Sequence, residues 1–355
     1  MPKKKKQFRF HILDILLLLI PISITAYFLK VHPVFVFFTT ATAIVGITHL
    51  IAESTAIIAE RVSTTISALI NATFGNVVEF LIAVFALRNG LVQLVRASIV
   101  GSIIINVLLL IGLSMLVGGL KYKEQKFNKD SAGLSSTMLI IAVVGLAMPS
   151  LYSMTVGTPE KSMSFAVSII LGVIYLLSLV YTFGTHRHLF TVEREALSER
   201  TGRWPLNIAI IVLVVATVVA GIESNFLVES INPLVSKTGM TETFLGIVFV
   251  ALLTNIPEHI SAMTFARRNN MTLSLEIGMS SALQIALFVV PILVLVSSTL
   301  TGGVLDLVFS PFELAAVLIT AMIANYIGSD GICHWVEGAQ LIAVYMLIAV
   351  AFYFL

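Results

Sequence analysis

The stretch NATFGNVVEF, residues 71–80, places Asn76 and Glu79 three residues apart inside a hydrophobic run. The stretch ALLTNIPEHI repeats this spacing with Asn255 and Glu258, 179 residues further along the chain. A charged side chain at the centre of a membrane helix costs about 2.5–3.5 kcal/mol on insertion scales, and such residues mark functional sites. One buried acid can be an accident, but two in matching positions require a common explanation.

The composition indicates a polytopic membrane protein. Of the 355 residues, 58% are hydrophobic and 11% are charged, against about 45–50% and about 25% in soluble domains. The formal net charge of +2 comes mostly from loop residues rather than a basic patch, so no nucleic-acid partner is expected. Cys333 is the single cysteine, which excludes an internal disulfide framework and any thiolate cluster.

Apolar runs of membrane-spanning length recur eleven times. They are predicted to be helices, because backbone groups in hydrocarbon must be satisfied within the segment and about 20 helical residues cross a bilayer. The first run follows a basic start, but Asp14 interrupts it and no small-x-small cleavage site follows, so we interpret it as a retained helix. The predicted helices lie near 12–30, 34–60, 63–87, 93–119, 132–150, 163–184, 206–230, 243–266, 272–299, 311–329 and 335–355.

Positive charges near the helix ends predict the orientation. Most of them fall on one side, which we take as cytoplasmic, so the N-terminus is inside and the C-terminus outside. Arg88 and Arg96 are the exceptions on the outer side. The predicted domains are the basic N-terminus with the first helix at 1–33, a first five-helix repeat at 34–184, a cytoplasmic linker at 185–204, and a second five-helix repeat at 205–355.

The two halves are related by an internal repeat. A shift of 179 residues superposes Ala72, Asn76, Glu79 and Ala83 on Ala251, Asn255, Glu258 and Ala262. The spacing puts each set on one helical face, and its small residues allow helices to approach closely. On the eleven-helix count the two helices run in opposite directions, so the repeats are inverted. Inverted repeats with polar sites at the bilayer midplane are typical of secondary transporters.

The helix after each acid carries a second polar set. The sets are Ser98, Ser102 and Asn106 in the first half and Ser280, Ser281 and Gln284 in the second. The serines match well between the halves. The amides match loosely, because Asn106 shifted by 179 falls on Ile285, one residue past Gln284.

Two facing acids in a membrane must be neutralised, either by one divalent cation or by a proton on each. The same groups therefore suit mutually exclusive binding of a metal ion or protons. Further ligands would be amide and hydroxyl oxygens and backbone carbonyls near Gly75 and Thr254, where Gly75 and Pro257 can break the helices. Such an all-oxygen set favours calcium over zinc or copper. The predicted metal ligands are Glu79 and Glu258.

Histidines near these motifs leave alternatives open. His259 either shares or tunes the site, or packs as a neutral imidazole bonded to a carbonyl. His49 and Glu53 have the spacing of metal ligands but no partner set, so a contact between helices is favoured, with Glu53 a minor candidate for a proton path.

Three long segments resemble the Ca2+/H+ antiporter family, the cation/proton exchanger branch of the calcium/cation antiporter superfamily. They are NATFGNVVEFLIAVFALRNG, ASIVGSIIINVLLLIGLSMLVGGLKY and NIPEHISAMTFARRNNMTLSLEIGMSSALQIALFVVP. The resemblance implies an all-α fold of one N-terminal helix plus two inverted five-helix repeats, and export of cytosolic calcium against proton entry. It also implies that Glu79 and Glu258 are the central cation and proton sites. The implied polar lining is Asn76, Asn255, Ser102, Ser281, Asn106, Gln284 and the matching histidine, His259.

The second motif departs from the family pattern Gly-Asn-Ala-Ala-Glu-His at Thr254, Ile256 and Pro257, and is similar there to the sodium-coupled branch. The predicted function is Ca2+/H+ exchange by alternating access. The alternative is exchange of sodium for calcium or another divalent cation, and a non-transport membrane scaffold is a remote one. We expect no enzymatic activity and no cofactor beyond the transported Ca2+ and H+. The expected partner is the lipid bilayer, and the sequence is compatible with a homo-oligomer. The membrane is predicted to be the bacterial cytoplasmic one.

Overall fold

The computed structural model describes residues 12–62, 64–182 and 204–355. By its internal contacts the chain divides into two compact units. Unit one comprises Met1–Ile82 and Thr191–Leu234, and unit two comprises Ala83–Phe190 and Val235–Leu355. The basic N-terminus and nearly all of the predicted linker lie outside the described residues. The predicted pair of repeats concerns sequence symmetry rather than contacts, and it stays a prediction.

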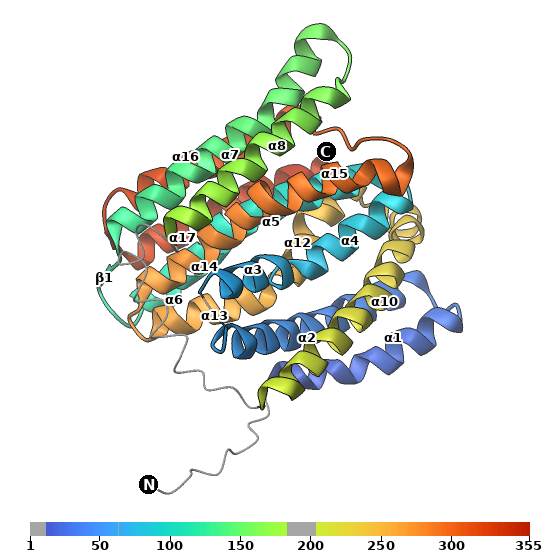
Figure 1. The fold of residues 1–355 in the computed structure, drawn as a ribbon, viewed down its shortest axis with the longest axis horizontal. Coiled ribbons are helices and arrows are strands. Elements are labelled where there is room, and N and C mark those ends of the chain that lie inside the picture. Colours follow the sequence, from blue (N-terminus) through green and yellow to red (C-terminus); the bar gives the residue numbers. More distant parts are fainter. Residues whose placement is uncertain (1–11, 63, 183–203) are drawn as a thin grey trace, which may run out of the picture. The chain divides into compact units, whose positions relative to one another are not determined.

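Unit one contains the helices before and after the first Asn/Glu motif. Its elements are the 3-10 helix η1 (Ile12–Leu18), α1 (Leu19–Phe28), α2 (Pro33–Ala59), α3 (Thr64–Phe74), the start of α4 (Val77–Arg88) and most of α10 (Leu206–Thr238). The second helix packs along α1 and against α3, and α1 and α2 run side by side in Figure 1. Tyr27 of α1 stacks on Phe226 of α10 with ring centroids 3.9 Å apart, which joins α10 to this group.

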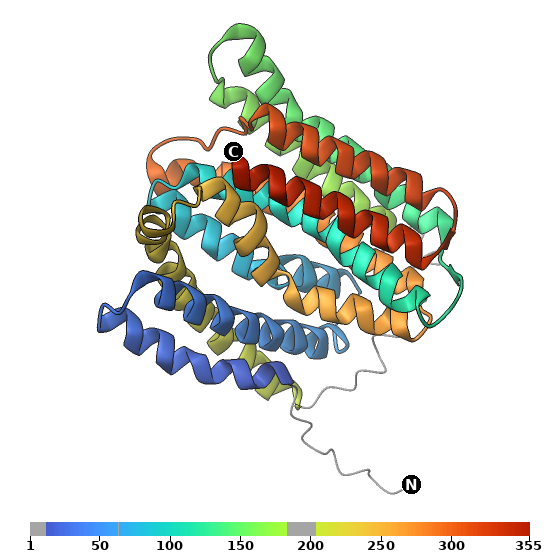
Figure 2. The ribbon, with the colours of Figure 1, turned by 180° about the vertical axis from the view of Figure 1, so that it is seen from behind.

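Unit two contains most of the helices. After the end of α4 come α5 (Val92–Ile104), η2 (Ile105–Leu110), α6 (Ile111–Gly119), β1 (Gln125–Lys126), α7 (Lys129–Val156), α8 (Lys161–Val180), α11 (Glu242–Phe244), η5 (Leu245–Val250), α12 (Ala251–Thr254), α13 (Ile256–Arg267), α14 (Met271–Gln284), η6 (Ile285–Val289), α15 (Val290–Thr301), α16 (Pro311–Gly328), β2 (Ile332–Cys333) and α17 (Trp335–Phe354). The three η segments named here are π-helical turns. Helix α17 lies along α6, as Figure 2 shows from behind.

The structure is that of an all-α polytopic membrane protein, as predicted. Within the described residues, eight helices are long and apolar enough to cross a membrane, with α5–η2–α6 and α14–η6–α15 each continuous, and the bent pair Glu242–Thr254 and Ile256–Arg267 makes a ninth if it is one span. The segment Ile12–Phe28 is shorter, and α3 and α4 have 11 and 12 residues. The count of eleven spans therefore stays a prediction. The antiparallel pairing of β1 with β2 was not predicted.

Glycines set the closest approach between helices in the core of unit two. A Cβ added to Gly101 of α5 would lie 2.5 Å from both the Cα and the carbonyl oxygen of Ile247 in η5. A Cβ on Gly278 of α14 would lie 2.7 Å from the carbonyl oxygen of Asn106 in η2. Both distances are far below van der Waals contact, so only glycine permits these approaches.

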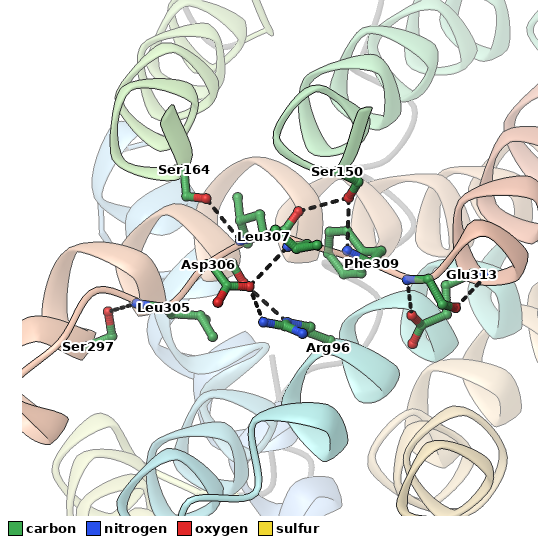
Figure 3. A network of polar contacts seen from close by, with 11 residues as sticks. Arg96, Ser150, Ser164, Ser297, Leu305, Asp306, Leu307, Phe309 and Glu313 are labelled. Carbon is green, nitrogen blue, oxygen red and sulfur yellow. Dashed lines mark hydrogen bonds and ion pairs between the residues drawn. The ribbon is translucent and has the colours of Figure 1, made fainter. Parts of the chain in front are cut away.

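The irregular segment 302–310, which connects α15 to α16, is held by serine hydroxyls from three helices (Figure 3). The bonds run from Leu305 N–H to Ser297 Oγ (2.7 Å), from Leu307 N–H to Ser164 Oγ (3.0 Å) and from Phe309 N–H to Ser150 Oγ (2.8 Å). The guanidinium of Arg96 on α5 pairs with the carboxylate of Asp306, and its Nε–H donates to the Asp306 carbonyl at 3.2 Å. Because buried backbone groups must find partners, these side chains replace the bonds that a helix would supply.

Candidate ion-binding site

Both Asn/Glu motifs lie at helix breaks. In the first motif α3 ends at Phe74 and α4 begins at Val77. In the second, Asn255 separates α12 from α13 with φ −101° and ψ 7°, and the helix axes differ in direction by 56°. Pro257 explains the second break, because proline has no N–H for the carbonyl four residues earlier and fits only the first turn of a new helix.

The break gives both glutamates the same local environment. Glu79 is the third residue of α4 and Glu258 is the third residue of α13. The first turn of a helix has unpaired N–H groups and the positive end of the helix dipole, which stabilise a carboxylate. Each acid therefore has local support for a negative charge that a position in mid-helix would lack. Asn76, just before α4, is buried, with 4% of its surface exposed.

In unit two, three polar side chains from separate helices form a hydrogen-bonded triangle. Asn106 of η2 donates from Nδ2 to Asn255 Oδ1 at 2.8 Å and to Ser281 Oγ of α14 at 3.0 Å. Ser281 Oγ in turn donates to Asn255 Oδ1 at 3.4 Å. All three residues are buried. The triangle thus connects the broken helix to the two polar helices that the sequence analysis matched to it.

Asn255 stands where a helix-capping residue would, yet its side chain makes no capping bond. Its Nδ2 donates to the Ala251 carbonyl at 2.8 Å and to Thr254 Oγ1 at 3.2 Å, while Oδ1 accepts from the other two members of the triangle. Every donor and acceptor of this amide is therefore used within the protein. These bonds join the broken helix to η2 and α14, and the part of Asn255 in ion binding stays a prediction.

Three buried atoms near the second motif have no hydrogen-bond partner within the described residues: Asn106 Oδ1, Glu258 Oε2 and His259 Nε2. The other ring nitrogen of His259, Nδ1, lies 2.7 Å from the Asn255 carbonyl. Because a carbonyl oxygen only accepts hydrogen bonds, Nδ1 carries the proton. His259 is therefore bonded to a carbonyl, which is one of the two alternatives predicted for it. Buried acceptors without partners are costly, and a bound cation or proton would remove that cost.

The other predicted residues lie around this triangle or in unit one. Ser102 is buried on α5, one turn before Asn106, and Thr254 Oγ1 donates to the Val250 carbonyl at 3.1 Å. Gln284 is the last residue of α14. In unit one, Gly75 lies in the first break, and His49 Nε2 is 3.9 Å from Asp14 Oδ1, a contact between helices as predicted. Within the described part of the chain, no group of three or more His, Cys, Asp and Glu is placed to hold a metal.

The π-helical turns are the feature that sequence reasoning missed. Asn106 is the second residue of η2, and Gln284 immediately precedes η6. A π turn adds one residue to the helical repeat and is frequent at functional sites. Hydropathy does not reveal such a turn, and the only signal was the one-residue slip between the two amides.

Broken membrane helices with buried polar side chains at the break are typical of secondary transporters. The chain belongs to the sodium/calcium exchanger protein family, whose profile matches residues 32–184 and 208–354. The resemblance predicted from the sequence motifs is thereby confirmed.

Two curated relatives are similar over most of the chain. A "Ca(2+)/H(+) antiporter" of Aphanothece halophytica is 38% identical over 356 residues, which cover 96% of this chain and 95% of the relative. The "Ca(2+)/H(+) antiporter ChaA" of Bacillus subtilis is 39% identical over 294 residues, which cover 82% and 84%. Among solved structures, native YfkE matches with a TM-score of 0.85 and 33% identity over 97% of this chain and all of that one. An H+/Ca2+ exchanger named CAX matches at 0.72 and 16% identity over 96% and 91%, a likeness of fold alone.

Proposed function

We propose that this protein exchanges cytosolic Ca2+ for external H+ by alternating access. The observation that carries the proposal is the 38% identity, over 96% of the chain, to a relative named as a Ca2+/H+ antiporter. The site chemistry supports it, because apart from His259 the polar side chains at the two breaks can offer a cation only oxygen ligands, and hard oxygen ligands favour calcium. The relatives' names favour proton coupling over the sodium-coupled alternative.

The proposed ion sites are Glu79 and Glu258. Two carboxylates are neutralised equally well by one Ca2+ or by two protons, so one pair of groups can hold either cargo but not both. The helix N-terminus at each break supports the ionised form that calcium needs. The buried Oε2 of Glu258 supports the protonated form, because a buried charge without a counterion is costly.

The surrounding residues have supporting roles in this proposal. Asn106 would offer Oδ1 to the ion, since its Nδ2 is already bonded to the triangle. Asn255 and Ser281 would fix the position of Asn106, and His259 would hold the Asn255 carbonyl in place. Asn76, Ser102 and Gln284 would complete the polar lining.

The topology is part of the proposal. We propose two inverted repeats, because the family profile matches the chain twice, over 32–184 and 208–354. The excess of lysine and arginine on one side supports a cytoplasmic N-terminus. Bacterial relatives support the bacterial cytoplasmic membrane as the location.

The test is calcium uptake into everted vesicles or proteoliposomes under an imposed pH gradient and, separately, an imposed sodium gradient. Wild-type protein should take up calcium with the pH gradient, and Glu79→Gln and Glu258→Gln should each abolish uptake. Glu313→Gln is the control, because Glu313 is a buried glutamate that caps α16, with its Oε2 accepting from Ser310 N–H at 2.8 Å. Uptake driven only by sodium would refute proton coupling. No uptake with either gradient would favour the alternative of a non-transport membrane scaffold.

A further inference from the structure

A small cavity lies in unit two beside the starts of α7 and α14, apart from the triangle of Asn106, Asn255 and Ser281. Its polar lining consists of Asn128, Ser135, Thr272 and Glu276. The cavity has room for about one water-sized particle. Sequence position suggests that Glu276 is an interfacial residue near a helix end, but only 9% of its surface is exposed.

The carboxylate of Glu276 is only half satisfied. Ser131 Oγ of α7 donates to its Oε1 at 2.6 Å. Its Oε2 is buried and has no hydrogen-bond partner among the described residues. No ion pair within the described ranges involves Glu276 either. A buried carboxylate with one hydrogen bond and no counterion is costly, and a bound cation or a proton at Oε2 would remove that cost.

The size and chemistry of the cavity limit what that charge can be. The space excludes an organic cation, and the polar groups around it are all carboxylate, hydroxyl or amide, which suits a hard monoatomic cation. A single carboxylate binds a divalent ion weakly, because calcium sites gain affinity with the number of charged ligands. Weak binding suits a site that an ion occupies only briefly on its way to the transport site.

The position of Glu276 connects the cavity to the proposed transport site. Glu276 and Ser281 are five residues apart on the same helix, about 7.5 Å along its axis. The other wall is formed by the start of α7, where Asn128 N–H donates to Thr272 Oγ1 at 3.0 Å. Residues 121–128, which precede α7, belong to the side that the charge pattern predicts to be cytoplasmic.

We propose that Glu276, with the hydroxyl groups of Ser135 and Thr272, forms a second, low-affinity Ca2+ site that an ion occupies before it reaches the site of Glu258. This inference rests on the proposed function. The carboxylate supplies charge, and the cavity admits one ion that has shed most of its water.

Equilibrium binding of radioactive calcium to the purified full chain tests the proposal. Wild-type protein should show a tighter and a weaker class of sites. Glu276→Gln should lose the weaker class and keep the tighter one, whereas Glu258→Gln should lose the tighter class. Ser135→Ala removes one hydroxyl without touching the carboxylate, and should weaken the second class while leaving the fold intact. Glu313→Gln should bind as wild type does.

Transport gives the second readout. In everted vesicles Glu276→Gln should raise the half-saturating calcium concentration by about tenfold and leave the maximal rate nearly unchanged. Wild-type binding classes in Glu276→Gln, or a change only in pH dependence, would overturn the proposal. Two binding classes without any wild-type transport would instead refute the proposed function and leave the second site standing.

Discussion

The substitution Gly101→Ala should damage both the fold and the ion site. The new Cβ would lie 2.5 Å from the Cα and carbonyl oxygen of Ile247 and 2.9 Å from its carbonyl carbon. All three are backbone atoms, so no side-chain rotation relieves the clash. Ordinary contact is about 3.5–4.0 Å, so α5 and η5 must separate by about 1 Å. Overpacking of this kind costs about 1–3 kcal/mol, and the upper end is expected where backbone must move.

The same displacement would reach the polar triangle. Asn106 lies five residues after Gly101, and Asn255 lies five residues after the end of η5. The bond from Asn106 Nδ2 to Asn255 Oδ1 is 2.8 Å long, and a shift of about 1 Å would stretch it past the limit for a hydrogen bond. Transport should therefore fall by more than the loss of folded protein explains.

The measurements are the free energy of unfolding of the purified protein in detergent and the initial rate of calcium uptake per folded molecule. Gly133→Ala on α7 is the matched control, because nothing lies within 4 Å of its added Cβ. Alanine there should stabilise the helix by up to about 1 kcal/mol and leave transport unchanged. Wild-type stability and transport in Gly101→Ala would refute the reasoning, as would equal losses in both variants.

Three further predictions follow from single contacts. A double-mutant cycle on Arg96→Ala and Asp306→Ala should give a coupling free energy of about 0.5–1 kcal/mol that falls with added salt, because the pair is partly exposed; additive effects would contradict it. Burial, and to a lesser degree the Glu337 charge, raises the pKa of the Cys333 thiol to about 12. Alkylation needs the thiolate, so at pH 8 it should be slow in folded protein and fast in detergent-denatured protein, and equal rates would refute this. The alkylation rate of the folded protein should keep rising above pH 9. In that range the thiol of the unfolded chain ionises while the buried Cys333 thiol keeps its proton, so the free energy of unfolding begins to fall. His259→Phe removes the side-chain donor of the Asn255 carbonyl and leaves it the backbone N–H of residue 259 at 3.1 Å, so it should cost about 0.5–1.5 kcal/mol, whereas His259→Asn should restore most of it; equal stability of the two would contradict the role of Nδ1.

Several features followed from the sequence because their causes are local. A run of apolar residues must be helical in a membrane wherever its neighbours lie, so the helical, polytopic architecture was predicted. Pro257 breaks its helix by its own covalent structure. The paired motifs of Asn76 with Glu79 and Asn255 with Glu258 are visible as a repeat, and the family resemblance rests on such motifs.

The tertiary structure decided which polar groups meet. Asn106 is 149 residues from Asn255 and 175 from Ser281. The local sequence does not predict that the amide group of Asn106 donates to both residues while its Oδ1 accepts no hydrogen bond within the described residues. The same holds for Glu276, which looks like a surface residue until α7 covers it with Ser131. Local chemistry fixes where a helix forms and breaks. A buried polar side chain takes its role from the donor or acceptor that packing brings to it, and only the folded chain determines that partner.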